Sequence, residues 1–567
     1  MRTMSEVRGE NQQQLQKVEI SAGGLAPLRD GRAHDYNGGE QGQNDGAEEQ
    51  LSLTRSPFLW LGRILLITLF CTNVYRAAKQ SIAHDEGLTY QWFLRGPFSD
   101  VWTKYNANNH ILHTYLCRIS IGIFGLSELS LRLPSLLGGA LYLCAVYRIC
   151  RHVFGQGPLF LLAVSLLSLN PFVLDYLSAA RGYGMAIAFF LWALYYFAKL
   201  DLHAPQKKAF WRIGIAAGLA VSANLTVLFP VIALGMALLI WCWLADRRGK
   251  VMWMAARHAL APAFLTMAVI LILPGCYAGA RLISKRAATQ TTVNDAAHRI
   301  FYAGGSSLRI GFESLIRASF FRHPIDAGSS KAEPMTGPPA VEALVLVCMA
   351  GAAVCCGGKI AATMVHTEIH STTPGQKLLI ITSATILITL LGVVVAHSVF
   401  AFPYPELRTG LYWIPLTTLA LVSFAGVLPR GPSVILGLAL SGLVIQYLAG
   451  FDTRFYLEWR YSSAARPIME RIRSLTSVHP DRPHCVGATW LMEPSLNFYR
   501  DMFKLTSIEE IRRQPPEETQ CEIYVLLGAD RSLATVRQLH VVLDDPVSGA
   551  MLAVAPELAA NDVPVKD

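Results

Sequence analysis

A succession of long, nearly uncharged apolar segments constrains this chain more than any other feature. A helix needs about 20 mostly apolar residues to cross the hydrocarbon core of a bilayer. We therefore predict an all-α polytopic membrane protein with about eleven transmembrane helices. The predicted spans lie near 57–76, 132–152, 157–176, 182–200, 211–227, 228–245, 258–278, 339–358, 377–400, 410–428 and 432–450.

The composition agrees with that prediction and excludes ordinary soluble folds. The 567 residues have a mean hydropathy of +0.36, and only 16% of them are charged, against roughly 25% in a typical soluble domain. The formal net charge is +9, but lysine and arginine cluster in short segments between the apolar runs, as the positive-inside rule predicts. The basic charge therefore indicates membrane orientation, and we expect no nucleic-acid partner.

The same charge bias predicts which loops face the cytoplasm. The most basic short loops, such as the one that holds Arg247 and Arg248, all fall on the cytoplasmic side if residues 109–125 lie along the membrane surface. We therefore predict an amphipathic interfacial helix over 109–125 rather than a twelfth span. The short loops on the opposite side then hold only Arg181 and Arg408, two exceptions to the bias that suggest a functional role.

These patterns divide the chain into three predicted parts. The first is polar and lacks apolar periodicity, so it cannot bury enough surface to fold. The second is the membrane unit, with two long outer loops, and the third is a small extracytoplasmic α/β domain. The predicted boundaries are 1–54 for a disordered cytoplasmic tail, 55–450 for the membrane unit with outer loops 77–131 and 279–338, and 451–567 for the C-terminal domain.

The predicted C-terminal domain contains short apolar runs that are typical of buried strands. Cys485 and Cys521 lie in two of these runs and form a disulfide if the domain faces an oxidising compartment. We expect strands near 484–490, 521–527 and 539–543 and helices near 464–475 and 495–503.

A pair of adjacent carboxylates, Asp85 and Glu86, follows the first predicted span closely. This placement puts them near the membrane surface, at the level of lipid head groups. Two neighbouring carboxylates can act as a general base and a partner that positions it. A solvated acidic turn explains the same dipeptide, so spacing alone leaves both interpretations open.

Further motifs around this pair resemble the GT-C class of membrane glycosyltransferases, in particular the protein O-mannosyltransferase and aminoarabinose transferase group. The resemblance covers roughly residues 57–430 and is most specific in HDEGLTYQWFLRG and in NNHILHTYLCRISIGIFGLSELSLRLPSLLGGAL. The family has two prolines where this chain has the segment 108–112. The matching positions, in order, are Asp85-Glu86, Phe124-Gly125 and Arg132-Leu133-Pro134-Ser135.

The resemblance implies an enzyme that transfers a hexose or pentose from a polyprenyl-phosphate carrier to a protein, glycan or lipid acceptor at the outer face, with inversion. Asp85 would be the general base and Glu86 its catalytic partner. Arg181 and Arg408 would stabilise the lipid phosphate as it leaves. The remaining predicted donor-binding residues are His110, Asp175, Tyr183 and Tyr404.

Alternatives remain open at several of these positions. Arg181 and Arg408 can simply snorkel to the interface. Asp175 either lines the cavity or pairs with Arg181, and Glu406 can pair with Arg408. Tyrosines such as Tyr183, Tyr404 and Tyr105 are common in the interfacial belts of all membrane proteins.

His110 and His113 share one helix face, but no dedicated metal motif is present. We therefore expect a reaction without a cofactor, and a divalent metal has no support.

Two other functions fit an apolar chain of this kind. A secondary transporter or lipid flippase is the main alternative, but such proteins usually show internal repeats and ionisable residues at the bilayer midplane. We find no repeat, and the conspicuous charges lie in predicted outer loops. A non-catalytic scaffold is the other alternative. We place the protein in a bacterial cytoplasmic membrane, and an endoplasmic reticulum location has the same topology.

Overall fold

The computed structural model describes residues 56–104, 108–272, 307–321, 338–366, 372–477 and 482–559. The predicted tail 1–54 and most of the predicted outer loop 279–338 lie outside the described residues.

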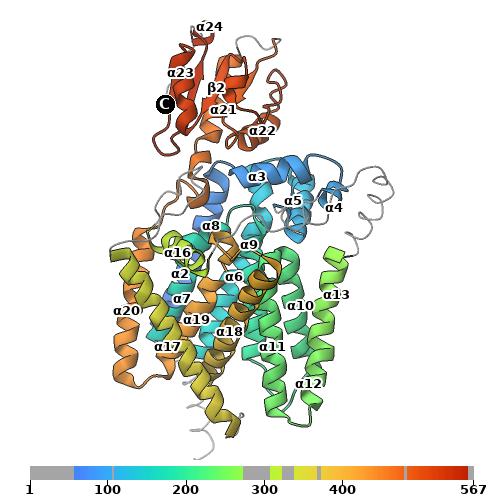
Figure 1. The fold of residues 1–567 in the computed structure, drawn as a ribbon, viewed down its shortest axis with the longest axis vertical. Coiled ribbons are helices and arrows are strands. Elements are labelled where there is room, and N and C mark those ends of the chain that lie inside the picture. Colours follow the sequence, from blue (N-terminus) through green and yellow to red (C-terminus); the bar gives the residue numbers. More distant parts are fainter. Residues whose placement is uncertain are drawn as a thin grey trace, which may run out of the picture. The chain divides into compact units, whose positions relative to one another are not determined.

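Helices make up almost all of the membrane unit (Figure 1). Prolines begin several of them, since a proline at the first helical position has no N–H to leave unpaired. The helices are α2 (Pro57–Lys79), α3 (His84–Thr89), α4 (Asp100–Thr103), α5 (Ile111–Phe124), α6 (Glu128–Phe154), α7 (Pro158–Ser168), α8 (Pro171–Tyr176), α9 (Gly182–Ala198), α10 (Lys207–Ala223), α11 (Leu228–Ala245), α12 (Lys250–Ala255), α13 (Ala261–Met267), α16 (Leu308–Ile316), α17 (Pro338–His366), α18 (Pro374–Phe400), α19 (Trp413–Val427) and α20 (Arg430–Ala449).

Within the described residues, seven helices are long and apolar enough to cross a membrane. Large apolar side chains face outward on several of them, as on α20, where Ile435 is 71% and Ile445 70% exposed. Such surfaces are stable against lipid rather than water. The chain is therefore a multi-pass integral membrane protein, while the number of eleven spans stays a prediction.

One predicted span is interrupted. The sequence predicted a single helix over 157–176, but the structure ends α7 at Ser168 and begins α8 at Pro171. Asn170 caps α8 by accepting a hydrogen bond from the amide of Val173 at 3.1 Å, and Pro171 cannot continue a preceding helix. The break sets α8, which carries Asp175, apart from the helix before it.

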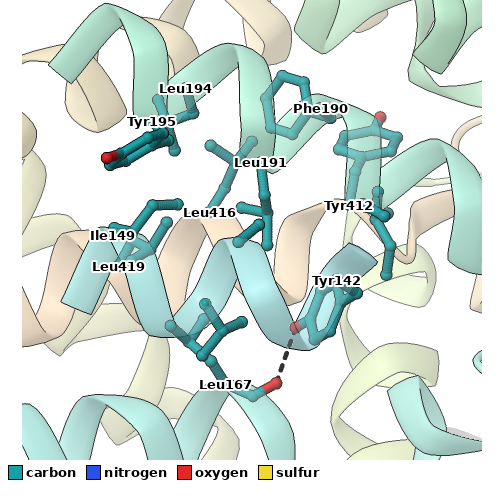
Figure 2. Close-up of a cluster of buried hydrophobic side chains, with 14 of the residues drawn as sticks. Tyr142, Ile149, Leu167, Phe190, Leu191, Leu194, Tyr195, Tyr412, Leu416 and Leu419 are labelled. Carbon is teal, nitrogen blue, oxygen red and sulfur yellow. Dashed lines mark hydrogen bonds between the residues drawn. The ribbon is translucent and has the colours of Figure 1, made fainter. Parts of the chain in front are cut away.

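The core of the membrane unit surrounds α9, whose side chains are almost all buried. Figure 2 shows α9 residues such as Phe190, Leu191 and Leu194 among side chains of the neighbouring helices. Tyr142 of α6 donates its hydroxyl to the carbonyl of Leu167 at 2.7 Å, which satisfies a polar group that burial would otherwise leave unpaired.

The C-terminal region contains a small four-stranded sheet in the order β1-β2-β4-β3. Strand β1 is parallel to β2, whereas β4 is antiparallel to both β2 and β3. The sequence analysis missed β4. The elements are η8 (Leu457–Ser462), α21 (Ala465–Thr476), β1 (Val486–Ala488), α22 (Glu493–Met502), β2 (Ile523–Leu526), α23 (Ser532–Val536), β3 (His540–Asp544), β4 (Met551–Val554) and α24 (Pro556–Ala559).

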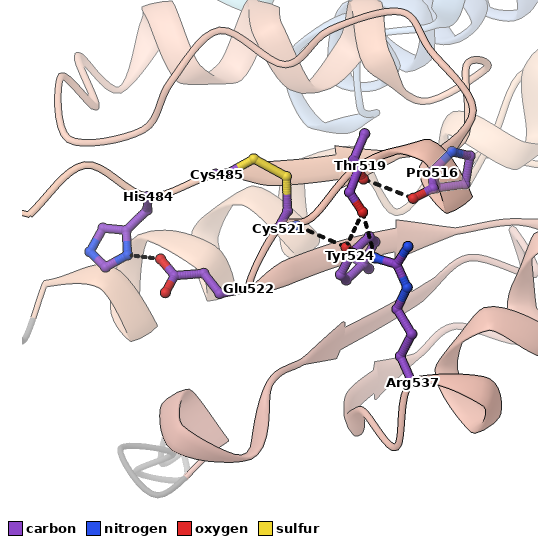
Figure 3. The surroundings of a disulfide bond; sticks show 8 residues. All are labelled: His484, Cys485, Pro516, Thr519, Cys521, Glu522, Tyr524 and Arg537. Carbon is purple, nitrogen blue, oxygen red and sulfur yellow. Dashed lines mark hydrogen bonds and ion pairs between the residues drawn. A yellow bond between two sulfur atoms is a disulfide. The ribbon is translucent and has the colours of Figure 1, made fainter.

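A disulfide joins Cys485, directly before β1, to Cys521, just before β2 (Figure 3). Beside it, His484 and Glu522 form an ion pair at 2.5 Å. Arg537 donates to the hydroxyl of Tyr524 on β2. The bridge therefore ties together the starts of the two parallel strands.

The C-terminal region packs directly on α3. The carbonyl of Leu491 accepts a hydrogen bond from His84 at 2.8 Å, and the hydroxyl of Tyr499 accepts one from the amide of Ile82 at 2.9 Å. Gly87 is required at this contact, since a Cβ at that position would lie 2.5 Å from the carbonyl carbon of Pro494. The contact fixes the helix that carries both predicted carboxylates.

Candidate active site

The candidate site is built on α3, the short helix that follows the first span. Its first turn contains Asp85 and Glu86, and carboxylates are favoured at a helix N-terminus. The Glu86 side chain accepts a hydrogen bond from the amide of Ala83 at 2.8 Å, which caps the helix. The two adjacent carboxylates then point into different surroundings.

Glu86 forms a closed ion pair with Arg132, so two of the motifs identified in the sequence meet in space. Arg132 Nε lies 2.9 Å from Glu86 Oε1 and Nη2 lies 2.6 Å from Oε2. Arg132 also donates to the carbonyls of Gln80 at 2.6 Å and Ser81 at 2.8 Å, beyond the end of α2. Both side chains are fully buried. The amide of Ala180 donates to Glu86 Oε1 at 2.5 Å.

Glu86 therefore has no free oxygen lone pair directed at a substrate cavity. The sequence analysis gave Glu86 a catalytic role beside Asp85. These contacts hold α3 against α2 and α6, because bidentate arginine–carboxylate pairs fix geometry as well as charge. A catalytic role for Glu86 stays a prediction.

Asp85 faces two arginines that are distant in sequence. Its Oδ2 lies 3.4 Å from Arg408 Nη2 and 3.6 Å from Arg181 Nη2. These distances are longer than direct hydrogen bonds. The Asp85 side chain is 9% exposed and that of Arg408 is 25% exposed. The structure thus brings together the carboxylate and the two arginines that the sequence singled out, with Arg408 as the member open to solvent.

The two arginines shift the pKa of Asp85. Burial alone would raise this pKa, because a buried carboxylate loses its hydration. The positive charges of Arg408 and Arg181 outweigh that effect, and the net pKa is below the ordinary value of 3.8. Trp459 also favours the ionised form of the carboxylate and lowers its pKa. Asp85 is therefore ionised at neutral pH.

Arg408 is held by a short, strained turn. It lies in the 3₁₀ segment η7 (Leu407–Gly410), whose first residue, Leu407, has a φ of 45°. A positive φ is uncommon for leucine and persists only where the surroundings enforce it. Here the amide of Leu407 donates to the hydroxyl of Ser314 on α16 at 2.9 Å. Part of the predicted outer loop 279–338 therefore positions Arg408.

Arg181 is buried and precedes α9. It donates to the hydroxyl of Thr89 on α3 at 3.2 Å and to the side-chain oxygen of Asn108 at 2.8 Å. These contacts link Arg181 to both motif stretches of the predicted outer loop 77–131, one through Thr89 and the other through Asn108. A buried arginine with several acceptors is too constrained for simple snorkelling to the interface.

His110 and Tyr183 lie next to this charge cluster. Their rings contact each other edge to face, with centroids 5.0 Å apart. Burial, together with the charge of Arg181, lowers the pKa of His110 well below its ordinary value. His110 Nε2 is buried without a hydrogen-bond partner among the described residues, so His110 is a neutral group at the edge of the site.

Glu458 is a site residue that the sequence analysis missed. Its Oε1 lies 3.5 Å from Arg408 Nη1, and its Oε2 is buried without a hydrogen-bond partner among the described residues. Burial and the nearby charges of Asp85 and Asp175 raise its pKa well above the ordinary value of 4.5. No motif marks Glu458, because it reaches the site from η8, which follows the last membrane helix.

The acidic residues near the two arginines in sequence have other partners in the fold. Asp175 pairs with Arg76 of α2, and it also accepts a hydrogen bond from the amide of Leu457 at 2.9 Å. Asp175 thereby joins the end of α2 to the C-terminal region. Arg408 pairs with Asp85 and Glu458, while Glu406 caps η7. Sequence proximity had suggested the alternatives Asp175–Arg181 and Glu406–Arg408.

The remaining predicted residues have separate surroundings. Tyr404 stacks on His397, with ring centroids 4.1 Å apart. His113 contacts the hydroxyl of Ser135 at 2.8 Å, and Tyr105 lies outside the described residues. Over the described part of the chain, no group of three or more His, Cys, Asp or Glu residues could hold a metal ion.

An apolar cavity of about 340 Å³ lies beside the segment that carries Arg408. Its wall includes Leu315 of α16 and Trp413 of α19. Leu315 touches the position of Gly410, two residues after Arg408, where a Cβ would lie 3.1 Å from the leucine side chain. The wall continues between α17, α18 and α20 with residues such as Ala350, Leu387 and Leu443. The cavity therefore extends from the segment that follows Arg408 to the space between α17, α18 and α20.

Residues 108–277 match the family described as dolichyl-phosphate-mannose-protein mannosyltransferase. Over this stretch, the predicted resemblance is confirmed. The matched stretch contains Arg132, Arg181 and Tyr183, whereas Asp85 and Arg408 lie outside it and reach Arg181 through the fold.

Among solved structures, the chain is similar to ArnT from Cupriavidus metallidurans in the apo state, at 14% identity and a TM-score of 0.44, over 89% of this chain and 99% of that chain. The same protein bound to undecaprenyl phosphate gives 16% identity and a TM-score of 0.42 over the same shares. The oligosaccharyltransferase of Archaeoglobus fulgidus gives 14% and 0.43, over 78% of this chain and 61% of that one. No curated protein has a sequence that matches this chain.

Proposed function

We propose that this chain is a membrane glycosyltransferase that moves a sugar from a polyprenyl-phosphate carrier to an acceptor at the extracytoplasmic face. The observation that carries the proposal is the convergence of the Asp85 carboxylate with Arg181 and Arg408, at 3.6 and 3.4 Å. The family match over residues 108–277 supports the same activity. The bacterial cytoplasmic membrane fits the predicted orientation.

In the proposed reaction, Asp85 removes the proton from an acceptor hydroxyl or amine. The acceptor oxygen or nitrogen then bonds to the anomeric carbon of the sugar from the side opposite the phosphate. The bond between the anomeric carbon and the phosphate oxygen breaks, and the configuration inverts. An ionised carboxylate is required at the start, which agrees with the lowered pKa of Asp85.

The polyprenyl phosphate leaves with the electron pair of the broken bond. Arg408 and Arg181 would stabilise the developing negative charge, since guanidinium groups bind phosphate through charge-assisted hydrogen bonds. The apolar cavity next to Arg408 would hold the first part of the polyprenyl tail. Trp413 at the cavity wall would then lie near the boundary between phosphate and tail.

The proposal is tested by incubating the purified protein with radiolabelled polyprenyl-phosphate sugar and a membrane extract as acceptor source. Wild type is expected to transfer label, whereas Asp85→Asn is expected to be at least about 100-fold slower, because general-base catalysis contributes roughly 10²–10⁴-fold. Asp100→Asn is the matched control: Asp100 is a buried carboxylate in the same outer loop that pairs with Lys104 at 2.9 Å.

Equal transfer by wild type and Asp85→Asn would remove Asp85 from the mechanism. If neither protein transfers label while reconstituted vesicles move solute or lipid across the bilayer, the transporter or flippase interpretation replaces the enzyme.

A further inference from the structure

A second cavity, a groove with basic residues at one end, lies on α2 far from the end that precedes Asp85. It has a volume of about 1030 Å³ and is formed mainly by α2 and α6. Arg63 of α2 lines it, 16 residues before Lys79 at the other end of that helix. At 1.5 Å per residue, this separation is roughly 24 Å. The groove therefore lies near the membrane surface that faces away from the candidate active site.

Three arginines gather at this groove. Arg63, Arg148 and Arg151 line it, and Tyr147 lies between them. Arg63 donates to the Tyr147 hydroxyl from Nε at 3.1 Å and from Nη2 at 3.0 Å. Arg151 donates to the same oxygen at 3.3 Å. Two guanidinium groups thus share one neutral acceptor.

Within the described part of the chain, this arrangement leaves the positive charge of the three arginines without a counter-ion. Among the residues that the structure describes, no carboxylate pairs with Arg63, Arg148 or Arg151. Like charges that share a neutral acceptor repel each other, and an anion placed between them would relieve that repulsion. A phosphate group has several oxygens that can accept from two guanidinium forks at once.

Apart from His152 and Tyr195, the rest of the groove is apolar, and it leads away from the arginines along α2. Leu66, Ile67 and Phe70 follow Arg63 on this helix, and Leu143 and Cys144 lie opposite them on α6. Ile67 is 63% exposed, so this wall faces outward from the bundle. Trp60 packs against Arg63, with 5.2 Å from the guanidinium carbon to the ring centroid, and is 54% exposed. Exposed tryptophan is typical of the membrane interface.

From these features, we infer that the groove binds an anionic phospholipid of the leaflet opposite the active site. The basic end fits the phosphate head group, and the apolar wall fits the first part of an acyl chain. Basic pockets between membrane helices on the cytoplasmic side bind acidic lipid head groups through the same chemistry. The predicted orientation places this groove at the cytoplasmic leaflet, where the surface carries negative charge.

The test measures lipid binding and needs no enzyme activity, so its result does not depend on the proposed transfer reaction. The protein is purified in neutral detergent and titrated with phosphatidylglycerol or with phosphatidylcholine of the same acyl chains. Native mass spectrometry counts the bound lipid. Wild type is expected to retain phosphatidylglycerol in preference to phosphatidylcholine.

Arg63→Gln together with Arg151→Gln is expected to weaken phosphatidylglycerol binding roughly 30-fold, since each basic residue near an anionic surface contributes about fivefold. The matched control is Arg247→Gln with Arg248→Gln, which removes the same charge from exposed residues of the predicted cytoplasmic side outside the groove. The control is expected to retain wild-type binding.

Three outcomes would overturn the inference: equal retention of both lipids by wild type, an equal loss in the control variant, or displacement of the lipid by an equal concentration of inorganic phosphate. The last result would assign the arginines to free phosphate. If the double variant does not fold, the comparison of the two lipids on wild type still decides the question.

Discussion

Asp85 and Glu86 are neighbours in sequence, yet they lie in two regions of opposite character. Around Glu86, every contact is short: the carboxylate binds Arg132 at 2.6 and 2.9 Å and accepts two backbone amides. Around Asp85, the two arginines stand at 3.4 and 3.6 Å. The Glu86 pair is fully buried, whereas Arg408 beside Asp85 is 25% exposed.

The difference separates a closed ion pair from an open one, and the proposed mechanism uses the open one. A carboxylate whose lone pairs are all occupied can orient a helix but cannot accept a proton from a substrate. Asp85, in contrast, faces two cations at distances longer than direct hydrogen bonds, and in the proposed reaction the phosphate and the acceptor would bind beside these three groups. The Glu86–Arg132 ion pair, here called the closed region, holds α3 in place. In the proposed mechanism, α3 then positions Asp85 beside Arg181 and Arg408, here called the open region.

The largest expected effect comes from breaking the closed region. Glu86→Ala is expected to destabilise the folded protein by about 3–5 kcal/mol, because it leaves the buried charge of Arg132 without its partner. Thermal unfolding of the purified protein in detergent measures this loss.

The double variant Glu86→Gln with Arg132→Met serves as the control for that prediction, since it removes both charges together. It is expected to be more stable than Glu86→Ala alone. If Glu86→Ala unfolds at the wild-type temperature, the ion pair is not structural and the contrast between the two regions fails.

Breaking the open region should affect rate rather than stability. Arg408→Gln is expected to slow transfer by about 10²–10³-fold, the usual effect of removing one donor that stabilises a developing anion. The unfolding temperature should change little, because Arg408 is partly exposed. Arg430→Gln, at the exposed start of α20, is the control and should transfer at the wild-type rate. An unchanged rate in Arg408→Gln would mean that the leaving phosphate is stabilised elsewhere.

The contact between α3 and the C-terminal region gives a smaller effect. Gly87→Ala places a methyl group 2.5 Å from the carbonyl carbon of Pro494, and such overpacking typically costs about 1–3 kcal/mol. We expect a lower unfolding temperature together with slower transfer, since α3 carries Asp85. A full rate in a destabilised Gly87→Ala protein would show that this contact does not position the base.

The smallest effect concerns pH. The pKa of Glu458 is raised in the folded protein, so folding favours its protonated form. The stability that this form contributes is present below the ordinary carboxyl pKa of 4.5 and is lost as the pH rises through the raised pKa. Glu458→Gln should remove this component from the plot of unfolding temperature against pH. Parallel curves for the two proteins would place the titration elsewhere.

The sequence predicted the helices of the membrane unit well because each apolar run is long and lacks charge. It also identified Asp85, Arg181 and Arg408, which the fold brings together. Asp85 was marked by the carboxylate pair after the first span, and the two arginines were marked as exceptions to the charge bias. Pro171 is a sequence signal for the break after α7, since proline cannot continue a preceding helix. We nevertheless predicted one span over 157–176, because the apolar run continues through this position.

What the sequence did not predict depends on long-range packing. Glu86 and Arg132 lie 46 residues apart, and Arg76 and Asp175 lie 99 apart. A single sequence gives no signal for such partners. Glu458 was missed for the same reason, because its carboxylate reaches Arg408 only when the segment after α20 folds back over α3 and α8.

The central claim is tested most directly by the single-turnover transfer rate of Asp85→Asn at saturating polyprenyl-phosphate sugar. Removal of the Asp85 charge frees Arg181 and Arg408 for the phosphate, so the donor should bind at least as tightly as to wild type. The transfer step itself should be at least about 100-fold slower. A wild-type rate at saturation, with only weaker donor binding, would contradict a general base at Asp85.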